Sequence, residues 1–91
     1  MNIAVLAYPG MTALDAVGPV QVLTAMPGAR VTWVAADPGP QKTDCRMAIV
    51  ADTSLGDLPH PEIVLVPGAL DVRPVMKDLR VLAWLRAAQE T

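Results

Sequence analysis

Apolar runs of strand length alternate along this chain with segments of helical periodicity. Four such runs predict strands, at Asn2 to Tyr8, Arg30 to Ala36, Met47 to Ala51 and Glu62 to Val66. The first and the last are almost wholly apolar, which is typical of parallel strands buried on both faces. Thr43 to Arg46 is expected to pair ahead of the third strand, at a sheet edge.

A first helix is expected after the Pro9-Gly10 turn. Leu14 and Val17 fall at helical spacing, and Thr12 has the chemistry of a helix cap. A proline deep inside a helix costs about 3 kcal/mol. Because Pro19 is best tolerated near the first turn, we place the regular helix from about Ala16 to Ala25.

The last third of the chain predicts another helix, capped by Asp78. Its apolar positions are expected to face inward and its polar positions outward, the two sets being Leu79, Leu82, Leu85 and Ala88, and Arg80, Arg86, Gln89 and Glu90. Short helical turns are expected at Ser54 to Leu58 and at Asp71 to Met76. Asp37 to Pro40 has the composition of a turn.

The order strand, helix, strand, strand, strand, helix predicts the opening half of a doubly wound α/β domain. We therefore expect an incomplete, flavodoxin-like three-layer sandwich with a mostly parallel sheet. Residues 1–91 are expected to form the N-terminal part of a single domain, since a chain of 91 residues is at most one small domain.

The composition indicates that some apolar surface is covered by another chain or segment. Hydrophobic residues make up 53% of the chain, above the roughly 45–50% of typical soluble domains. A domain this small hides only about 60–65% of its unfolded surface. A second protein chain, or a homodimer, is therefore an expected partner.

Charge and residue type argue against nucleic-acid binding, a membrane span, a secretory signal and a metal site. Seven basic and nine acidic residues give a net charge of −2 without a basic cluster, so we expect no nucleic-acid partner. No apolar run reaches the roughly 20 residues of a membrane span, and no basic segment precedes the first strand. Cys45 is the single cysteine, which fits a reducing cytoplasm. Because His60 is the single histidine, no metal site is expected.

Asp15 is the first candidate for chemistry. It follows the first apolar strand and precedes a Gly18-Pro19 pair. Open α/β sheets bind ligands at the carboxyl ends of their strands, where this carboxylate is expected. The alternative is structural: a helix N-cap that compensates the helix dipole, worth about 1 kcal/mol.

Two motifs at their correct separation resemble the ThiJ/PfpI superfamily. They are Leu14-Asp15-Ala16-Val17-Gly18-Pro19 and Val64-Leu65-Val66-Pro67-Gly68-Ala69. The resemblance implies a class I glutamine-amidotransferase-like fold. It covers only the N-terminal half of complete members, which are roughly twice as long.

The resemblance implies three catalytic parts: an acidic side chain, a cysteine on a strand-to-helix elbow, and backbone N–H groups after a Pro-Gly turn. Asp15 matches the acidic position, and Gly68 and Ala69 match the turn, with Ala69 replacing a second glycine. Ala69 keeps the N–H donor of an oxyanion site unless its backbone requires a positive φ. The elbow cysteine has no counterpart and is expected beyond Thr91. We expect Cys45 to be a small packing residue.

An aspartate at the acidic position is similar to isonitrile hydratases and to ligand-binding domains of AraC-type regulators. The first case implies a lyase that needs no cofactor and hydrates an isonitrile, its small-molecule substrate, to an N-substituted formamide. Asp15, partly shielded from water near Gly68, would then handle protons for the thiolate. Without that thiolate the 91 residues are expected to be inactive alone. The alternatives are a non-catalytic sensor domain and a structural half-domain completed by another chain.

Overall fold

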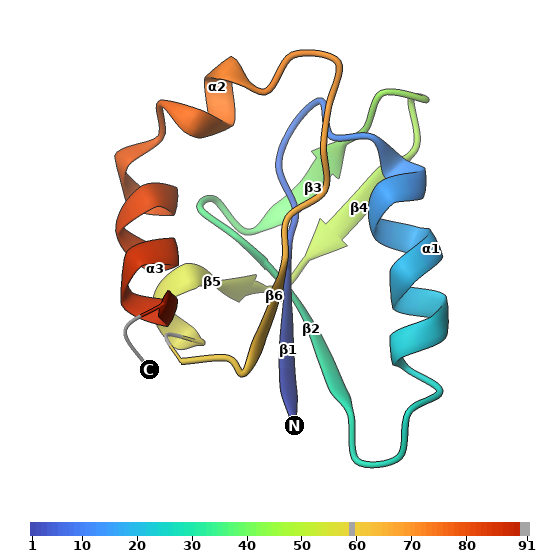
Figure 1. Cartoon of the computed structure of the whole chain (residues 1–91). Coiled ribbons are helices and arrows are strands. Elements are labelled where there is room, and N and C mark those ends of the chain that lie inside the picture. Colours follow the sequence, from blue (N-terminus) through green and yellow to red (C-terminus); the bar gives the residue numbers. More distant parts are fainter. Residues whose placement is uncertain (59, 90–91) are drawn as a thin grey trace.

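A parallel β-sheet lies between helices in the computed structural model, which describes residues 1–58 and 60–89 (Figure 1). The elements in chain order are β1 (Asn2–Leu6), α1 (Ala13–Leu23), β2 (Arg30–Ala35), β3 (Gly39–Lys42), β4 (Ala48–Ala51), β5 (Thr53–Ser54), the 3-10 turn η1 (Leu55–Asp57), β6 (Ile63–Leu65), α2 (Arg73–Met76) and α3 (Leu79–Gln89). Helix α1 lies on one side of the sheet, and α2 and α3 lie on the other (Figure 1).

The order of strands in the main sheet is β5-β2-β1-β6, and each neighbouring pair is parallel. The central strand β1 pairs with β2 and β6 on its two edges, so that Val5 lies beside both Trp33 and Leu65. The expected α/β fold with a mostly parallel sheet is confirmed. Strand β1 ends two residues earlier than expected, although the Ala7 N–H still donates to the Val34 carbonyl at 2.8 Å.

The core follows from the composition of β1, whose residues Ile3 to Leu6 are completely buried. Ala4 and Leu6 belong to one hydrophobic cluster with Val81 and Trp84 of α3. Because side chains alternate along a strand, Ile3 and Val5 lie on the opposite face, which is the side of α1. A strand that is apolar on both faces is therefore covered on both faces.

The predicted strand Met47 to Ala51 is found as β4, but the segment expected to pair with it was wrong. Gly39 and Pro40, expected in a turn, begin β3, which pairs antiparallel with β4. The segment Thr43 to Arg46, expected as a strand, is the turn of that hairpin. Positive φ values at Gly39 (128°) and Arg46 (69°) allow the chain to bend into and out of the hairpin. The brief parallel strand β5 had been expected as loop and short helix.

Helix α1 begins three residues before the expected start. Pro19 therefore lies in the helix interior rather than near its first turn. The buried side chains are those of Ala13 and Ala16, whereas Leu14 is 75% exposed. The helix thus turns small residues toward the sheet, and the apolar spacing of the larger ones did not identify the buried face.

Helix α3 has the predicted extent over the described residues, but a different face is buried. Val81 and Trp84 pack into the core, and the Trp84 indole N–H donates to the Leu58 carbonyl at 2.9 Å. Leu79 is 78% exposed and Leu82 is also exposed. Apolar residues occur on most sides of this helix, so spacing alone could not select the buried face. Glu90, expected to face outward, lies outside the described residues.

Large apolar side chains are exposed on several elements, and Leu70 is 96% exposed. This agrees with the excess of apolar residues in the composition. None of the helices in the described part of the chain is both long and apolar enough to cross a bilayer.

Candidate functional site

The strand order places a topological switch point between β1 and β6. From β1 the chain moves outward to β2 and β5, and then returns to the opposite edge of β1 as β6. The loops that follow β1 and β6 therefore start next to each other, but they lead to helices on opposite faces of the sheet. Open α/β sheets bind ligands at this place.

Backbone contacts join these two loops directly. The Thr12 N–H donates to the Gly68 carbonyl at 2.8 Å, and Met11 and Ala69 form an antiparallel β-bridge. The buried Tyr8 hydroxyl donates to the Pro67 carbonyl. The structure thus brings the Pro67 to Ala69 turn against the start of α1.

Asp15 and Gly68, 53 residues apart in sequence, are in contact. The Gly68 N–H donates to Asp15 Oδ2 at 3.2 Å. A Cβ added at Gly68 would lie 3.1 Å from the same oxygen, which is tighter than most contacts of a real Cβ. The φ of Gly68 is outside the left-handed range. Glycine is therefore suited to this position by the close approach of Asp15 and not by its backbone conformation.

The N-cap part of the structural alternative for Asp15 is not found, although its place in the first turn of α1 still suits the helix dipole. Asp15 is the third residue of α1, and Thr12 is the N-cap by position, with no hydrogen bond from its side chain. An α1 N–H is instead satisfied from the hairpin turn, where Asp44 Oδ1 accepts from the Ala13 N–H at 3.2 Å. The sequence carried no local signal for this cap, because Asp44 is 31 residues away.

The expected shielding of Asp15 from water was wrong, because its side chain is exposed among the described residues. Its neighbour Tyr8 is the buried titratable group, with 6% of its surface exposed. Burial raises the pKa of Tyr8 above its usual value of 10.0, and the negative charge of Asp15 raises it further. The phenol is therefore held neutral as a hydrogen-bond donor.

The backbone at Ala69 does not require a positive φ, so alanine can stand where the motif has a second glycine. Arg46 is the non-glycine residue with a positive φ in the described chain, so Ala69 has an ordinary backbone conformation. Among residues 1–58 and 60–89 the Ala69 N–H has no hydrogen-bond acceptor. The Gly68 N–H, in contrast, is already engaged by Asp15.

Cys45 is an exposed free thiol in the turn between β3 and β4, and the expectation that it packs in the interior was wrong. Its sulfur lies 3.4 Å from the Thr43 hydroxyl. That hydrogen bond is the main cause that lowers the pKa of the Cys45 thiol. His60 is exposed in a loop, as expected. No group of three metal-ligating side chains was found within the described ranges.

The chain is similar in sequence to isonitrile hydratase from Pseudomonas putida, with 30% identity over 87 residues. That match covers 96% of this chain and 38% of the relative. No protein-family model matches the chain. The chain thus spans well under two thirds of the curated relative that it matches.

The chain is also similar to parts of several solved structures. A THiJ/PfpI family protein from Pseudomonas syringae superposes with a TM-score of 0.91 at 31% identity, over 98% of this chain and 38% of that protein. DJ-1beta from Drosophila melanogaster has the same fold, with a TM-score of 0.84 at 24% identity, over 98% of this chain and 50% of that protein. In sequence and in fold, the chain is thus similar to a part of these longer ThiJ/PfpI and DJ-1 proteins, and it spans 38–50% of their length.

Proposed function

We propose that this chain supplies the acid and a backbone donor of an isonitrile hydratase site. The reaction is the hydration of an isonitrile to an N-substituted formamide. Two observations support it: the sequence similarity to an isonitrile hydratase, and the hydrogen bond between Asp15 and the Gly68 N–H. The second carries the proposal, because it unites residues from the two loops at the switch point.

In the proposed reaction a thiolate adds to the terminal carbon of the isonitrile. That carbon receives a proton, and a thioimidate forms. Water then adds to the same carbon, the C–S bond breaks, and the thiol leaves as the formamide is released. Each stage requires a proton carrier within hydrogen-bond reach of the reacting atoms. Asp15 is the proposed carrier, since its exposed carboxylate is free to exchange protons with substrate and water.

Ala69 is proposed to stabilise the charge that develops during these additions. Its N–H has no acceptor within the described part of the chain, whereas the Gly68 N–H is occupied by Asp15. One donor of this kind is typically worth about 3–4 kcal/mol in the transition state. The proposed division of labour is that Gly68 holds the acid and Ala69 faces the substrate.

The test is the hydration of an alkyl isonitrile by the protein that carries this sequence. Asp15→Asn is expected to lower kcat/KM about 100-fold or more, the usual contribution of a positioned proton carrier. Asp52→Asn is the matched control, since Asp52 is also exposed but contacts the Thr53 hydroxyl away from the switch point. Equal activity of the two variants contradicts the proposal.

The thiolate is proposed to come from outside these 91 residues, because Cys45 lies in the turn between two paired strands and not on a strand-to-helix elbow, although that turn adjoins the start of α1 through Asp44. Alkylation of Cys45, or Cys45→Ser, is then expected to leave hydration unchanged. The purified 91-residue chain alone is expected to be inactive. Hydration by that chain that persists after alkylation of Cys45 would refute this placement of the nucleophile.

A second chain, or a second copy, is proposed to cover the outer edge of β6. Within the described residues β6 pairs only with β1, and the nearby Ile63 and Val66 are exposed. An open strand edge presents unpaired backbone groups that bind another strand. Sedimentation should therefore give a mass above that of one chain, and a well-folded strict monomer argues against this partner.

A further inference from the structure

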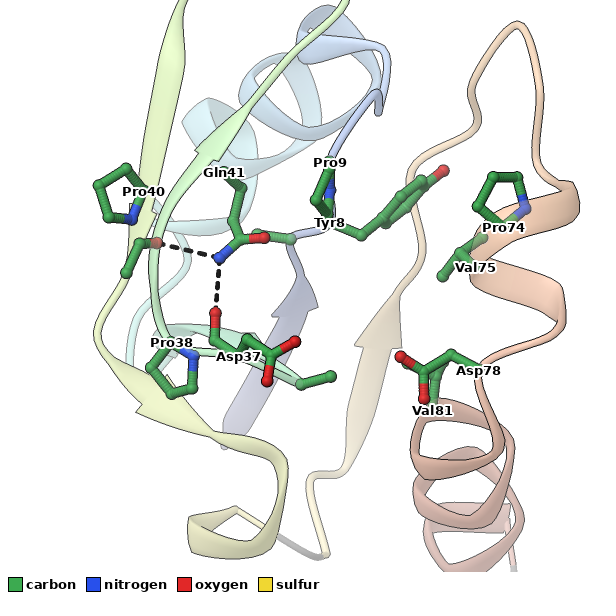
Figure 2. A pocket seen from close by; sticks show the side chains of 13 residues that line it. Tyr8, Pro9, Asp37, Pro38, Pro40, Gln41, Pro74, Val75, Asp78 and Val81 are labelled. Atoms are coloured by element: carbon green, nitrogen blue, oxygen red, sulfur yellow. Dashed lines mark hydrogen bonds between the residues drawn. The ribbon is translucent and has the colours of Figure 1, made fainter.

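A cavity of about 500 Å³ lies beside the switch point and is separate from the Asp15 and Gly68 contact, since neither of those residues lines it. It opens between the end of β1, the start of the β3–β4 hairpin and helices α2 and α3 (Figure 2). Ligand cavities usually measure about 300–1,000 Å³. The volume therefore suits a small organic molecule.

The walls of the cavity are largely apolar, although its four prolines are also exposed to solvent. Four prolines line it, and Tyr8, Val75 and Val81 add further apolar surface. Proline rings have fixed φ angles, so a wall built from them is already shaped before a ligand enters. Figure 2 shows Pro38 and Pro40 on one side of the cavity and Pro74 on the other.

Gln41 provides a single directed acceptor in this wall. Only 5% of its surface is exposed, and its Nε2 donates to the Asp37 carbonyl at 2.8 Å and to the Gly39 carbonyl at 3.1 Å. These two bonds fix which end of the amide is nitrogen. Among the described residues Gln41 Oε1 has no donor, and Figure 2 shows it turned away from the two bonds toward the side of Tyr8. Because no fully buried side-chain oxygen or nitrogen of the described residues lacks a partner, Oε1 is open to the cavity, where a ligand N–H or O–H group can replace water.

The charged groups at the cavity favour a cation. Asp37 and Asp78 both line it (Figure 2), and all four of their carboxylate oxygens accept hydrogen bonds from Arg80. Arg80 bridges them, with distances of 2.8 Å to Asp37 and 2.9 Å to Asp78. Two carboxylates and one guanidinium leave one negative charge, which attracts an ammonium group and repels an anion.

We propose that this cavity binds a small organic ammonium with an apolar or aromatic body. The body contacts the proline-rich walls and the Tyr8 ring, and the ammonium donates to Gln41 Oε1 near the carboxylates of Asp37 and Asp78. The proposal does not depend on isonitrile hydration, because the cavity is lined by other residues.

Phenethylammonium is a suitable probe, titrated into the isotopically labelled protein and followed by NMR. Chemical shifts of Ala7, Ala36 and the Gln41 side-chain amide are expected to move together and to saturate. Phenylacetate, of similar size and opposite charge, is expected to bind about tenfold more weakly. Shifts confined to other residues, or equal binding of the anion, overturn the proposal.

Variants provide an independent check. Gln41→Met removes the acceptor, and Val75→Phe fills part of the cavity without touching Gln41. Each is expected to weaken binding about tenfold or more. Val72→Phe is the matched control, because Val72 precedes α2, is exposed and does not line the cavity. If Val75→Phe and Val72→Phe bind the probe as tightly as the unaltered protein, the cavity is not its site.

Discussion

The Tyr8 hydroxyl donates a hydrogen bond to the backbone carbonyl of Pro67, 59 residues away in sequence. Both residues are buried, and each follows a strand, Tyr8 after β1 and Pro67 after β6. The bond therefore fixes the Pro-Gly turn relative to the loop that leads to Asp15. A single phenol thus helps to place the two halves of the proposed site.

Replacement of Tyr8 by phenylalanine is expected to destabilise the protein. Tyr8→Phe keeps the ring but leaves the buried Pro67 carbonyl without its donor, which should lower the free energy of unfolding by about 1–2 kcal/mol. Urea denaturation measures this change. Thr24→Val is the control, because the Thr24 hydroxyl bonds the Val20 carbonyl at an exposed position. Its effect should stay within about 0.5 kcal/mol, and an equal loss in both variants would contradict the role of Tyr8.

Stability at alkaline pH should depend on the same phenol. The pKa of Tyr8 is raised in the folded state, so its neutral form favours folding below the usual value of 10.0. This stabilisation is lost as the pH rises through the folded-state pKa. Unfolding curves measured from pH 9 upward should fall more steeply for the unaltered protein than for Tyr8→Phe. Parallel curves would show that Tyr8 titrates alike in the folded and unfolded states.

Gly68→Ala should affect activity more than stability. The new Cβ would lie 3.1 Å from Asp15 Oδ2 and would displace that carboxylate. Displacement of a reacting group is expected to lower isonitrile hydration about 10- to 100-fold. The free energy of unfolding should change by less than about 1 kcal/mol, because the φ of Gly68 suits alanine. Gly56→Ala, with no heavy atom within 4 Å of its new Cβ, is the control.

The ion pairs of Arg80 should stabilise the folded protein at neutral pH but not at acidic pH. Arg80 lowers the pKa values of Asp37 and Asp78 below their usual 3.8, mainly through hydrogen bonds. The stabilisation is therefore present above that pH and disappears as the carboxylates are protonated at lower pH. Arg80→Met should be slightly less stable than the unaltered protein at pH 7 and equally stable near pH 2.

Arg73→Met is the control for this comparison. Arg73 forms its ion pair with Asp71, only two residues away, and joins no distant elements. It should show little difference at either pH, since exposed local pairs contribute little to folding. If Arg73→Met loses as much stability as Arg80→Met at pH 7, the link between α3 and the turn after β2 has no special role.

Cys45 should react readily with thiol reagents in the folded protein. Its sulfur is exposed, and the Thr43 hydroxyl lowers the pKa of the thiol. The midpoint of the pH–rate profile with a disulfide reagent should therefore lie below the ordinary value of 9.0. Thr43→Val should move it upward, and an unchanged midpoint in that variant would exclude the hydroxyl as the cause.

Strands β1, β2 and β6 were predictable from runs of apolar and β-branched residues, and of these three β1 is the strand that is buried on both faces. A parallel sheet with helices on each side provides that burial, so local composition already implied the layered fold. Strand β3 was missed because Gly39 and Pro40 have turn chemistry, although its partner β4 lies within the predicted strand Met47 to Ala51. The pairing of Gly39 and Pro40 with Ala51 and Val50 is a non-local contact that local propensity does not encode.

The sequence by itself determined the α/β class and the parallel strands β1, β2 and β6, because both depend on residue type and short-range spacing. It offered Asp15 and Gly68 as candidate site residues through two motifs that resemble the ThiJ/PfpI superfamily. Only the tertiary structure decided that Val81 and Trp84 form the buried face of α3 and that Asp44 caps α1. It also decided that Asp15 is exposed to water, because solvent access depends on which distant segments cover a residue and not on the residues beside it in the chain.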